Sequence, residues 1–193
     1  MELFFDLQMT SSQRKNILDA IGVERAVTRL SHEILESNKG VNNLVLVAIR
    51  SGGVRLAEMI AAKIKEVEQA DVPVGIVDIT LYRDDLSVGT HHPEIRRTEI
   101  DFSIDDKTLI LVDDVLYTGR TVRSAMDALI DFGRPKSIRL AVLIDRGHRE
   151  LPIRADFVGR NVPTSKQEAI EANLEGDLRV DVVPLKKRDG QEN

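Results

Sequence analysis

Two adjacent carboxylates follow an aliphatic run and precede a small hydroxyl-rich turn. In the stretch LILVDDVLYTGRTV, Asp113 and Asp114 come directly after four aliphatic residues, and the turn at residues 117–121 lies shortly beyond. Carboxylates at the carboxyl end of a strand can accept hydrogen bonds from the vicinal hydroxyls of a sugar, or hold a divalent cation through water. This stretch is the strongest candidate for a site in the chain.

The turn at residues 117–121 has the composition of a phosphate-binding turn. It is expected to open a helix, whose first N–H groups and positive dipole end attract anions. Gly119 lets the backbone approach the anion, and the hydroxyls of Thr118 and Thr121 add donors. A ribose 5'-phosphate would satisfy the acids and the turn together. The alternative, an ordinary capped helix start, needs only one acid and not two.

Two common nucleotide-binding motifs are absent. The chain has neither the GxxxxGK[ST] of a P-loop nor the GxGxxG of a dinucleotide-binding fold. It also has no cysteine, which excludes a disulfide framework, a thiolate metal site and a catalytic thiol. Any chemistry must therefore come from carboxylates, hydroxyls, backbone amides and cations.

Strand and helix patterns alternate along the chain. Strands are expected at 44–49, 74–80, 108–112 and 138–145, and helices at 23–37, 54–67 and 121–132. The alternation predicts an α/β fold with a doubly wound, mostly parallel sheet, and the length of 193 residues fits a single domain over 1–193. The polar stretch 81–104 is expected to be a functional lid, or hood, because a stretch of this length is seldom an idle loop in a compact domain. The tail at about 185–193 is expected to be mobile.

Composition and charge narrow the class of protein. The chain is 42% hydrophobic and 31% charged, which is typical of a globular protein, and its aliphatic runs are too short to cross a bilayer. We therefore expect no membrane association and a cytoplasmic location. The net charge of -5 argues against indiscriminate nucleic-acid binding. Adjacent His91 and His92 have no apparent third ligand, which argues against a metal site there.

One region departs from the acidic average. Residues 134–166 contain eight Lys or Arg and three acids, a local charge of +5. Such a segment could follow a phosphate backbone, particularly where a symmetric oligomer joins two copies. With five Phe, two Tyr and no Trp, the chain lacks the aromatic residues for reading single strands, so any RNA would be recognised by hairpin shape and charge.

The stretch 109–121 resembles the 13-residue phosphoribosyl-diphosphate motif of the type I phosphoribosyltransferases. Further stretches resemble the members of that family that join uracil transfer to the regulation of pyrimidine genes: 78–86, 133–135, 142–156 and 161–166. The likeness covers roughly residues 22–183. It implies a uracil phosphoribosyltransferase that makes UMP and diphosphate from uracil and phosphoribosyl diphosphate with Mg²⁺.

The resemblance also implies partners. Many such members bind a hairpin of the pyrimidine leader mRNA when UMP is bound and so promote transcription termination, and they form homodimers or larger homo-oligomers. The motif at 109–121 is common to the whole family. Two alternatives therefore stay open at this point, namely an enzyme without RNA regulation and a phosphoribosyltransferase that uses purines.

Residue roles carry over from the family by position. Asp113, Asp114 and Arg83 would be catalytic, with Mg²⁺ held by substrate and by water near the two acids. The implied substrate-binding residues are Arg50, Ser51, Gly52, Gly53, Tyr117, Thr118, Gly119, Arg120, Thr121, Phe157 and Val158. The implied RNA-binding residues are Arg29, His32, Lys39, Arg146, Arg149 and Arg154.

Some of these assignments have an alternative or depart from the family. Phe157 could equally be a core residue, because aromatic packing is the commoner use. The basic residues on 23–37 could equally form a solvated helix face balanced by Glu33 and Glu36. Gly52 replaces the Arg of the family's pyrophosphate loop, and Ser37 stands where relatives often carry Arg.

Overall fold

A five-stranded parallel sheet forms the centre of the molecule. The computed structural model describes residues 14–50, 52–82 and 98–185. The sheet has the order β3-β2-β4-β5-β6, and every neighbouring pair is parallel. Its strands are β2 (Leu44–Ile49), β3 (Val74–Val77), β4 (Thr108–Leu116), β5 (Ser137–Asp145) and β6 (Phe157–Asn161).

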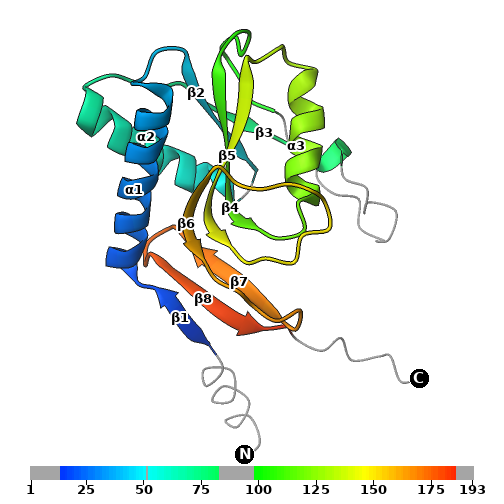
Figure 1. The fold of residues 1–193 in the computed structure, drawn as a ribbon. Coiled ribbons are helices and arrows are strands. Elements are labelled where there is room, and N and C mark those ends of the chain that lie inside the picture. The colour runs from blue at the N-terminus through cyan, green and yellow to red at the C-terminus, as the bar shows by residue number, and fades with distance from the viewer. Residues whose placement is uncertain (1–13, 51, 83–97, 186–193) are drawn as a thin grey trace, which may run out of the picture.

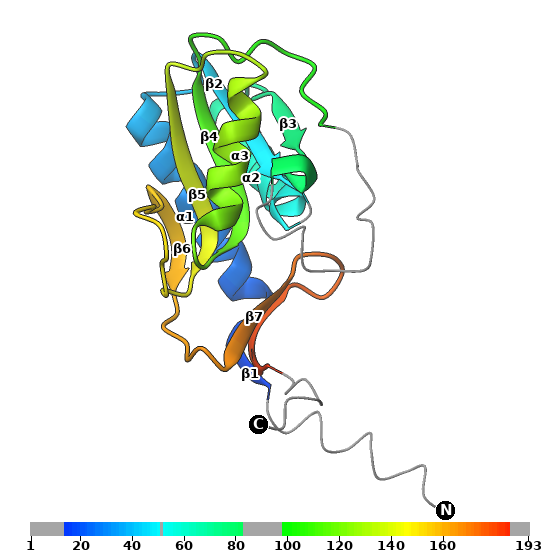
Figure 2. The same ribbon diagram turned by 90° about the vertical axis from the view of Figure 1, so that its right-hand side faces the viewer.

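Helices cover both faces of this sheet, as a doubly wound fold requires. Helices α1 (Ala20–Asn38) and α2 (Gly53–Glu68) lie on one face, and α3 (Arg120–Ile130) lies on the other (Figures 1 and 2). Helix α1 begins at a capping residue, since the Asp19 carboxylate accepts a hydrogen bond from the Gly22 amide at 2.8 Å. The predicted fold class is confirmed.

Strand β2 explains the continuous aliphatic pattern of 44–49. Leu44, Leu46 and Ala48 pack into the core under α1 and α2, whereas Val45, Val47 and Ile49 pack into the core under α3. Successive side chains of a strand point to opposite faces, so a strand that is covered on both faces needs apolar residues throughout.

A second, smaller sheet joins the two ends of the described chain. It is antiparallel with the order β1-β8-β7, where β1 is Lys15–Leu18, β7 is Glu168–Asn173 and β8 is Arg179–Pro184 (Figure 1). Its apolar side reaches the core through Leu18, Val180 and Val182. Neither this sheet nor β6 was predicted from the sequence.

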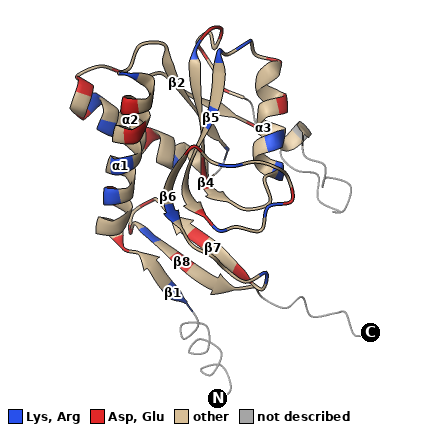
Figure 3. Ribbon diagram, in the orientation of Figure 1, with Lys and Arg blue, Asp and Glu red and all other residues tan. Residues whose placement is uncertain are grey.

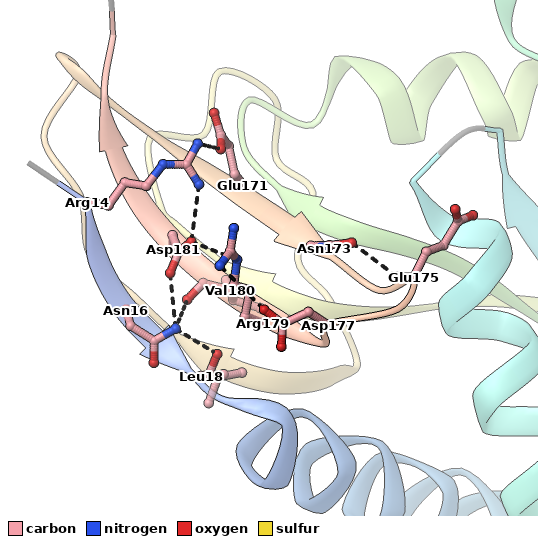
Figure 4. Close-up of polar contacts among 10 residues, drawn as sticks. All are labelled: Arg14, Asn16, Leu18, Glu171, Asn173, Glu175, Asp177, Arg179, Val180 and Asp181. Carbon is pink, nitrogen blue, oxygen red and sulfur yellow. Dashed lines mark hydrogen bonds and ion pairs between the residues drawn. The ribbon is translucent and has the colours of Figure 1, made fainter. Parts of the chain in front are cut away.

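The polar side of the small sheet carries an ion-pair network around Asp181 (Figure 4). The buried Asp181 carboxylate accepts hydrogen bonds from Asn16 Nδ2 at 3.0 Å and Arg14 Nη1 at 3.3 Å. Arg179 Nε lies 3.4 Å from the same carboxylate. These contacts join β1 to β8.

Two predicted strands end elsewhere. The strand predicted at 74–80 ends at Val77, because the Asp78 carboxylate accepts the Thr80 amide at 2.7 Å and turns the chain into a short 3-10 helix at Thr80–Tyr82. The strand predicted to end at Val112 continues to Leu116, because β5 pairs with it as far as Leu116 and Asp145. Asp113 and Asp114 therefore lie inside β4.

The predicted hood at 81–104 falls partly outside the described residues, since residues 83–97 are not among them, and nor are His91, His92 or the tail 186–193. The end of that stretch belongs to the fixed part of the fold. Glu99 exchanges two backbone hydrogen bonds with Ile76 at 2.8 Å, and Ile104 is fully buried. Residues 98–104 are therefore packed against the sheet. No described helix has the length and apolar character needed to span a membrane.

Candidate phosphoribosyl site

The two acids lie where β4 extends beyond its neighbour β2. Val112 pairs with Ala48 near the end of β2, and from Asp113 onward β4 pairs only with β5. The strict alternation of the strand is broken at this point, because Val112 and Val115 pack on the same side, against the core under α1 and α2. The acids thus occupy an irregular strand segment at the carboxyl edge of the sheet, where parallel sheets bind ligands.

Each carboxylate is held by the backbone. Asp113 Oδ1 accepts the Asp114 amide at 3.1 Å, and Asp114 Oδ1 accepts the Val115 amide at 2.7 Å. Burial raises the pKa of Asp113 well above its usual value, and the neighbouring charge of Asp114 raises it further. Burial also raises the pKa of Asp114, while the backbone amides oppose that shift. The site therefore favours a ligand that donates hydrogen bonds or brings positive charge to these oxygens.

Helix α2 starts directly against the two acids, which brings the predicted diphosphate loop to the predicted ribose site. A Cβ atom on Gly53 would lie 2.1 Å from the Val112 carbonyl oxygen, and one on Gly52 would lie 2.4 Å from Asp114 Oδ1. Gly52 has ordinary helical angles, φ -68° and ψ -38°, so it is the Asp114 carboxylate, and not the backbone, that leaves no room for a side chain.

A cleft opens between the start of α2, the acids and the small sheet. Its lining residues come from the end of β4, from the beginning of α2 and from the connection between β7 and β8: Gly52, Arg55, Asp114, Ala172, Asn173, Leu174 and Glu175. The β7 end of that connection is ordered by the Asn173 side chain, which accepts the Glu175 amide at 3.2 Å (Figure 4). The contribution of residues 172–175 was not predicted from the sequence, because no motif marks it.

The turn at residues 117–121 leads from β4 into α3, as predicted. Gly119 caps the helix with φ +93°, in the left-handed region that favours glycine. Gly119 has no side chain to cap this helix start, and Thr118 Oγ1 accepts the Arg120 amide at 3.3 Å. The first turn of α3 therefore presents backbone donors at a positive dipole end.

Two arginines that were assigned to RNA support this turn. Arg149 donates to the carbonyl oxygen of Tyr117 at 2.7 Å and to that of Ile153 at 3.1 Å, and it pairs with Asp145. Arg146 is 6% exposed and lies over the Tyr117 ring at 4.1 Å. Their guanidinium groups are engaged within the protein, and contact of Arg146 and Arg149 with RNA stays a prediction.

Arg146 also reaches the chain that leads to the small sheet. It donates to Thr164 Oγ1 at 3.0 Å, to the Ser165 carbonyl at 3.1 Å and to the Glu168 carbonyl at 2.6 Å. One buried side chain thus connects the turn after β4 with the start of β7. A buried arginine needs most of its donors paired, and these contacts supply the partners.

The chain matches the family model described as phosphoribosyl transferase domain over residues 13–173. The chain belongs to the phosphoribosyltransferase family. Within this family, a protein from Pelotomaculum thermopropionicum named bifunctional protein PyrR is 60% identical over 171 residues, covering 87% of this chain and 94% of the relative. A protein of the same name from Acetivibrio thermocellus is 63% identical over 161 residues, covering 83% and 88%. The predicted family is confirmed.

Solved phosphoribosyltransferases have the same fold at low sequence identity. A hypoxanthine-guanine phosphoribosyltransferase from Bacillus anthracis is 20% identical, with a TM-score of 0.64 over 88% of this chain and 98% of the other. A hypoxanthine phosphoribosyltransferase from Trypanosoma cruzi is 17% identical, with a TM-score of 0.67 over 89% and 97%. At this identity the likeness concerns the fold and does not indicate which base is used.

The remaining predicted substrate residues lie in different parts of the molecule. Arg50 follows β2, and its Nη2 atom lies 2.7 Å from Glu99 Oε1. Phe157 is 6% exposed in the core beneath α1 and α2, so it is a packing residue, the alternative that the sequence left open. Val158 packs against the core on the α3 side. Ser51 and Arg83 lie outside the described residues.

The other predicted RNA residues lie on the surface. Arg29, His32 and Lys39 are exposed on or just after α1, and Arg154 is exposed between β5 and β6. Figure 3 shows basic positions along α1 in this phosphoribosyltransferase. Arg29 pairs with Glu33 at 3.4 Å and donates to the Gly159 carbonyl, so its guanidinium is partly engaged. This ion pair is compatible with a solvated helix face as well as with an RNA-binding one.

The donor set of the cleft fits a divalent cation held mainly by substrate. Within the described ranges no group of three or more His, Cys, Asp or Glu residues could hold a metal alone. Asp114 and Glu175 nevertheless line the same cleft, and carboxylate oxygens are the ligands that Mg²⁺ prefers, usually together with water and substrate phosphates.

Proposed function

We propose that this phosphoribosyltransferase converts uracil and phosphoribosyl diphosphate into UMP and diphosphate, and that its UMP-bound form binds a hairpin of pyrimidine leader mRNA and promotes transcription termination. The observation that carries the catalytic part is the packing of the α2 start against Asp113 and Asp114, with the helix-opening turn 117–121 directly after the same strand. The choice of uracil is supported by the relatives named bifunctional protein PyrR.

Each part of phosphoribosyl diphosphate has a candidate partner. Asp113 and Asp114 accept hydrogen bonds from the ribose hydroxyls. The backbone donors and hydroxyls of residues 117–121, which include Arg120, bind the 5'-phosphate. The residues 50–53 at the start of α2 receive the diphosphate, where glycines permit close approach of amide groups.

The reaction replaces one bond at the ribose carbon by another. The bond from C1' to the diphosphate oxygen breaks, its electron pair leaves with diphosphate, a uracil nitrogen bonds to C1', and that nitrogen loses its proton. Positive charge develops on the sugar during this exchange, so the buried carboxylates of β4 stabilise it and hold the ribose in line. Arg83, at the base of the predicted hood, would approach the reacting atoms.

Mg²⁺ would be held by the diphosphate oxygens and by water near Asp113 and Asp114. Bound there, it would neutralise the charge of the leaving diphosphate. The raised pKa of Asp113 indicates that this carboxylate gains most from a nearby cation, because a positive charge favours its ionised form.

The RNA-binding part of the proposal uses the exposed basic residues of α1 and of 150–156. Arg29, His32, Lys39 and Arg154 are accessible for phosphate contacts, whereas Arg146 and Arg149 donate to the chain's own carbonyl groups. A homodimer or larger homo-oligomer would place two such surfaces side by side, which suits a hairpin longer than one protomer. Both activities belong to the cytoplasm, where leader mRNA is made.

Base preference provides the decisive test. Uracil, hypoxanthine and guanine are offered separately with phosphoribosyl diphosphate and Mg²⁺, and nucleotide formation is followed by chromatography. We expect turnover of uracil. Turnover of a purine and not of uracil would replace this proposal by a purine phosphoribosyltransferase.

The RNA part has its own measurement. Binding of a pyrimidine leader hairpin is titrated with and without UMP at several salt concentrations, with Lys39→Ala as the variant and Lys63→Ala, on α2, as its control. We expect UMP to tighten binding and Lys39→Ala to lower the salt slope by about one phosphate contact. Equal affinity for the hairpin and an unrelated RNA would leave an enzyme without RNA regulation.

A further inference from the structure

The cleft beside Asp114 contains an arginine that no motif identifies. Arg55 lies in the first turn of α2 and lines the cleft together with Gly52 and Asp114. The other charged residues of the cleft lining are the acids Asp114 and Glu175. Arg55 is thus the basic residue among the described residues that line this cleft.

Position 52 carries no cation, because it is a glycine. A Cβ there would lie 2.4 to 2.6 Å from the three terminal atoms of the Asp114 side chain. A side chain at this position would require the Asp114 carboxylate to move aside. A cation that serves this side of the cleft must therefore come from a neighbouring position, and Arg55 is two residues beyond Gly53 on the same helix start.

The placement of Arg55 is unfavourable for the helix itself. Backbone N–H groups give the start of a helix a partial positive charge, so acidic residues stabilise the first turn and basic ones do not. Helix α2 has no acidic residue in its first turn and no side-chain cap. The amide groups and the guanidinium therefore add to one positive end beside the cleft, which suits a polyanion.

The guanidinium can leave its present partner at little cost. Arg55 Nη1 lies 3.0 Å from Glu58 Oε2, and both side chains are half exposed, at 51% and 52%. Exposed pairs of this kind contribute little to stability. A diphosphate offers two adjacent oxygens that match the planar arrangement of guanidinium donors better than one exposed carboxylate does.

We propose that Arg55 binds the diphosphate group of phosphoribosyl diphosphate, and so supplies the cation that Gly52 cannot. This inference rests on the proposed phosphoribosyl transfer. It predicts that Arg55 distinguishes the diphosphate-bearing substrate from the product UMP, which has the same ribose and 5'-phosphate but no diphosphate.

The test compares three ligands by calorimetry: phosphoribosyl diphosphate with Mg²⁺, inorganic diphosphate with Mg²⁺, and UMP. For Arg55→Ala we expect affinity for the two diphosphate ligands to fall roughly 10- to 100-fold, as for loss of a charged hydrogen bond, while UMP binding stays within twofold. The matched control is Lys63→Ala, which removes another exposed pair of the same helix, Lys63 to Glu66 at 2.6 Å. This control should bind all three ligands as the unmodified protein does.

Two results would overturn the assignment of Arg55. One is that Arg55→Ala binds phosphoribosyl diphosphate with an affinity within twofold of that of the unmodified protein. The other is an equal loss of affinity for UMP, which would indicate that Arg55→Ala affects the fold or the electrostatic field of the whole site. Failure of the unmodified protein to bind any of the three ligands would instead contradict the proposed function itself.

Discussion

The two sheets of this molecule are held together in different ways. The five-stranded sheet consists of parallel strands joined by local connections and buried on both faces, as β2 illustrates. The three-stranded sheet joins β1 to β8, whose paired residues Asn16 and Asp181 are 165 positions apart. One side of it reaches the core, and the other carries the ion pairs of Arg14, Asp181 and Arg179 (Figure 4).

The two sheets therefore contribute different parts of the cleft. The large sheet supplies Asp113, Asp114, the turn 117–121 and the start of α2, and each of these segments was proposed as part of the site from the sequence. The small sheet supplies residues 172–175, which face Asp114 only because β7 and β8 are anchored across the molecule. Changes in the large sheet should therefore affect chemistry first, and changes in the small sheet should affect local stability first.

The largest effect is expected from the combined change of Asp113→Asn and Asp114→Asn. Loss of both charges removes the acceptors for the ribose and the stabilisation of the developing positive charge. We expect kcat/KM for UMP formation to fall by roughly 10²- to 10³-fold or more. Asp71→Asn, at an exposed position paired with Lys65, serves as the control and should retain activity. Near-normal turnover by the double variant would refute the site.

A second prediction concerns the contact between α2 and β4. Gly53→Ala places a methyl group 2.1 Å from the Val112 carbonyl oxygen, so the helix start must move away from the acids. We expect the free energy of unfolding to fall by about 1–3 kcal/mol, measured in urea, together with weaker binding of phosphoribosyl diphosphate.

The matching glycine change in the small-sheet connection should be mild. Gly176 has φ +64°, and no atom lies within 4 Å of an added Cβ. Asparagine tolerates this conformation, so Gly176→Asn should change stability by about 0.5 kcal/mol or less. Equal losses at Gly53 and Gly176 would contradict the proposed difference between the two sheets.

A third prediction addresses the anchor of the small sheet. Asp181→Asn removes the charge that Arg14 and Arg179 share, and we expect a loss of about 1–2 kcal/mol. Hydrogen exchange should become faster for amides of β1 and β8, while those of β4 keep their protection. Asp177→Asn, whose side chain is 78% exposed, should have little effect. Uniformly faster exchange in both sheets would show that they unfold as one unit.

The pH dependence of the free energy of unfolding tests the large sheet through a smaller expected effect. The pKa of Asp113 is raised in the folded protein above its ordinary value of 3.8, so the folded state binds this proton more tightly than the unfolded state does. The resulting stabilisation is fully present below about pH 3.8 and is lost as pH rises through the folded-state pKa. As pH rises, the free energy of unfolding of the unmodified protein should therefore fall relative to that of Asp113→Asn. A difference that does not change with pH would contradict this account.

Much of the large sheet could be predicted from the sequence. The run 44–49 is a strand with the predicted bounds, and the helix predicted at 121–132 forms at Arg120–Ile130. These elements are determined by local patterns of apolar residues and by glycine. The end of β4 was misplaced, because a carboxylate pair looks like a strand end, whereas pairing with β5 extends the strand through it.

The small sheet could not be predicted in the same way. Strand β7 reads EAIEAN, a polar sequence with no clear strand signal, and it is a strand because β8 pairs with it. The surroundings of Arg146 could not be predicted for a related reason. Its charge suggests a surface position, but the Tyr117 ring and three backbone or hydroxyl acceptors lie around it only in the folded chain.

The sequence by itself determined the family, the doubly wound sheet and the phosphoribosyl motif, because these depend on contiguous residues whose spacing has a direct physical meaning. Tertiary structure alone decided which charged residues face the cleft. Asp114, Arg55 and Glu175 line that cleft, whereas Arg146 and Arg149 donate to the chain's own carbonyl groups. The physical reason is that burial and pairing of a charge depend on distant segments, which local patterns do not record.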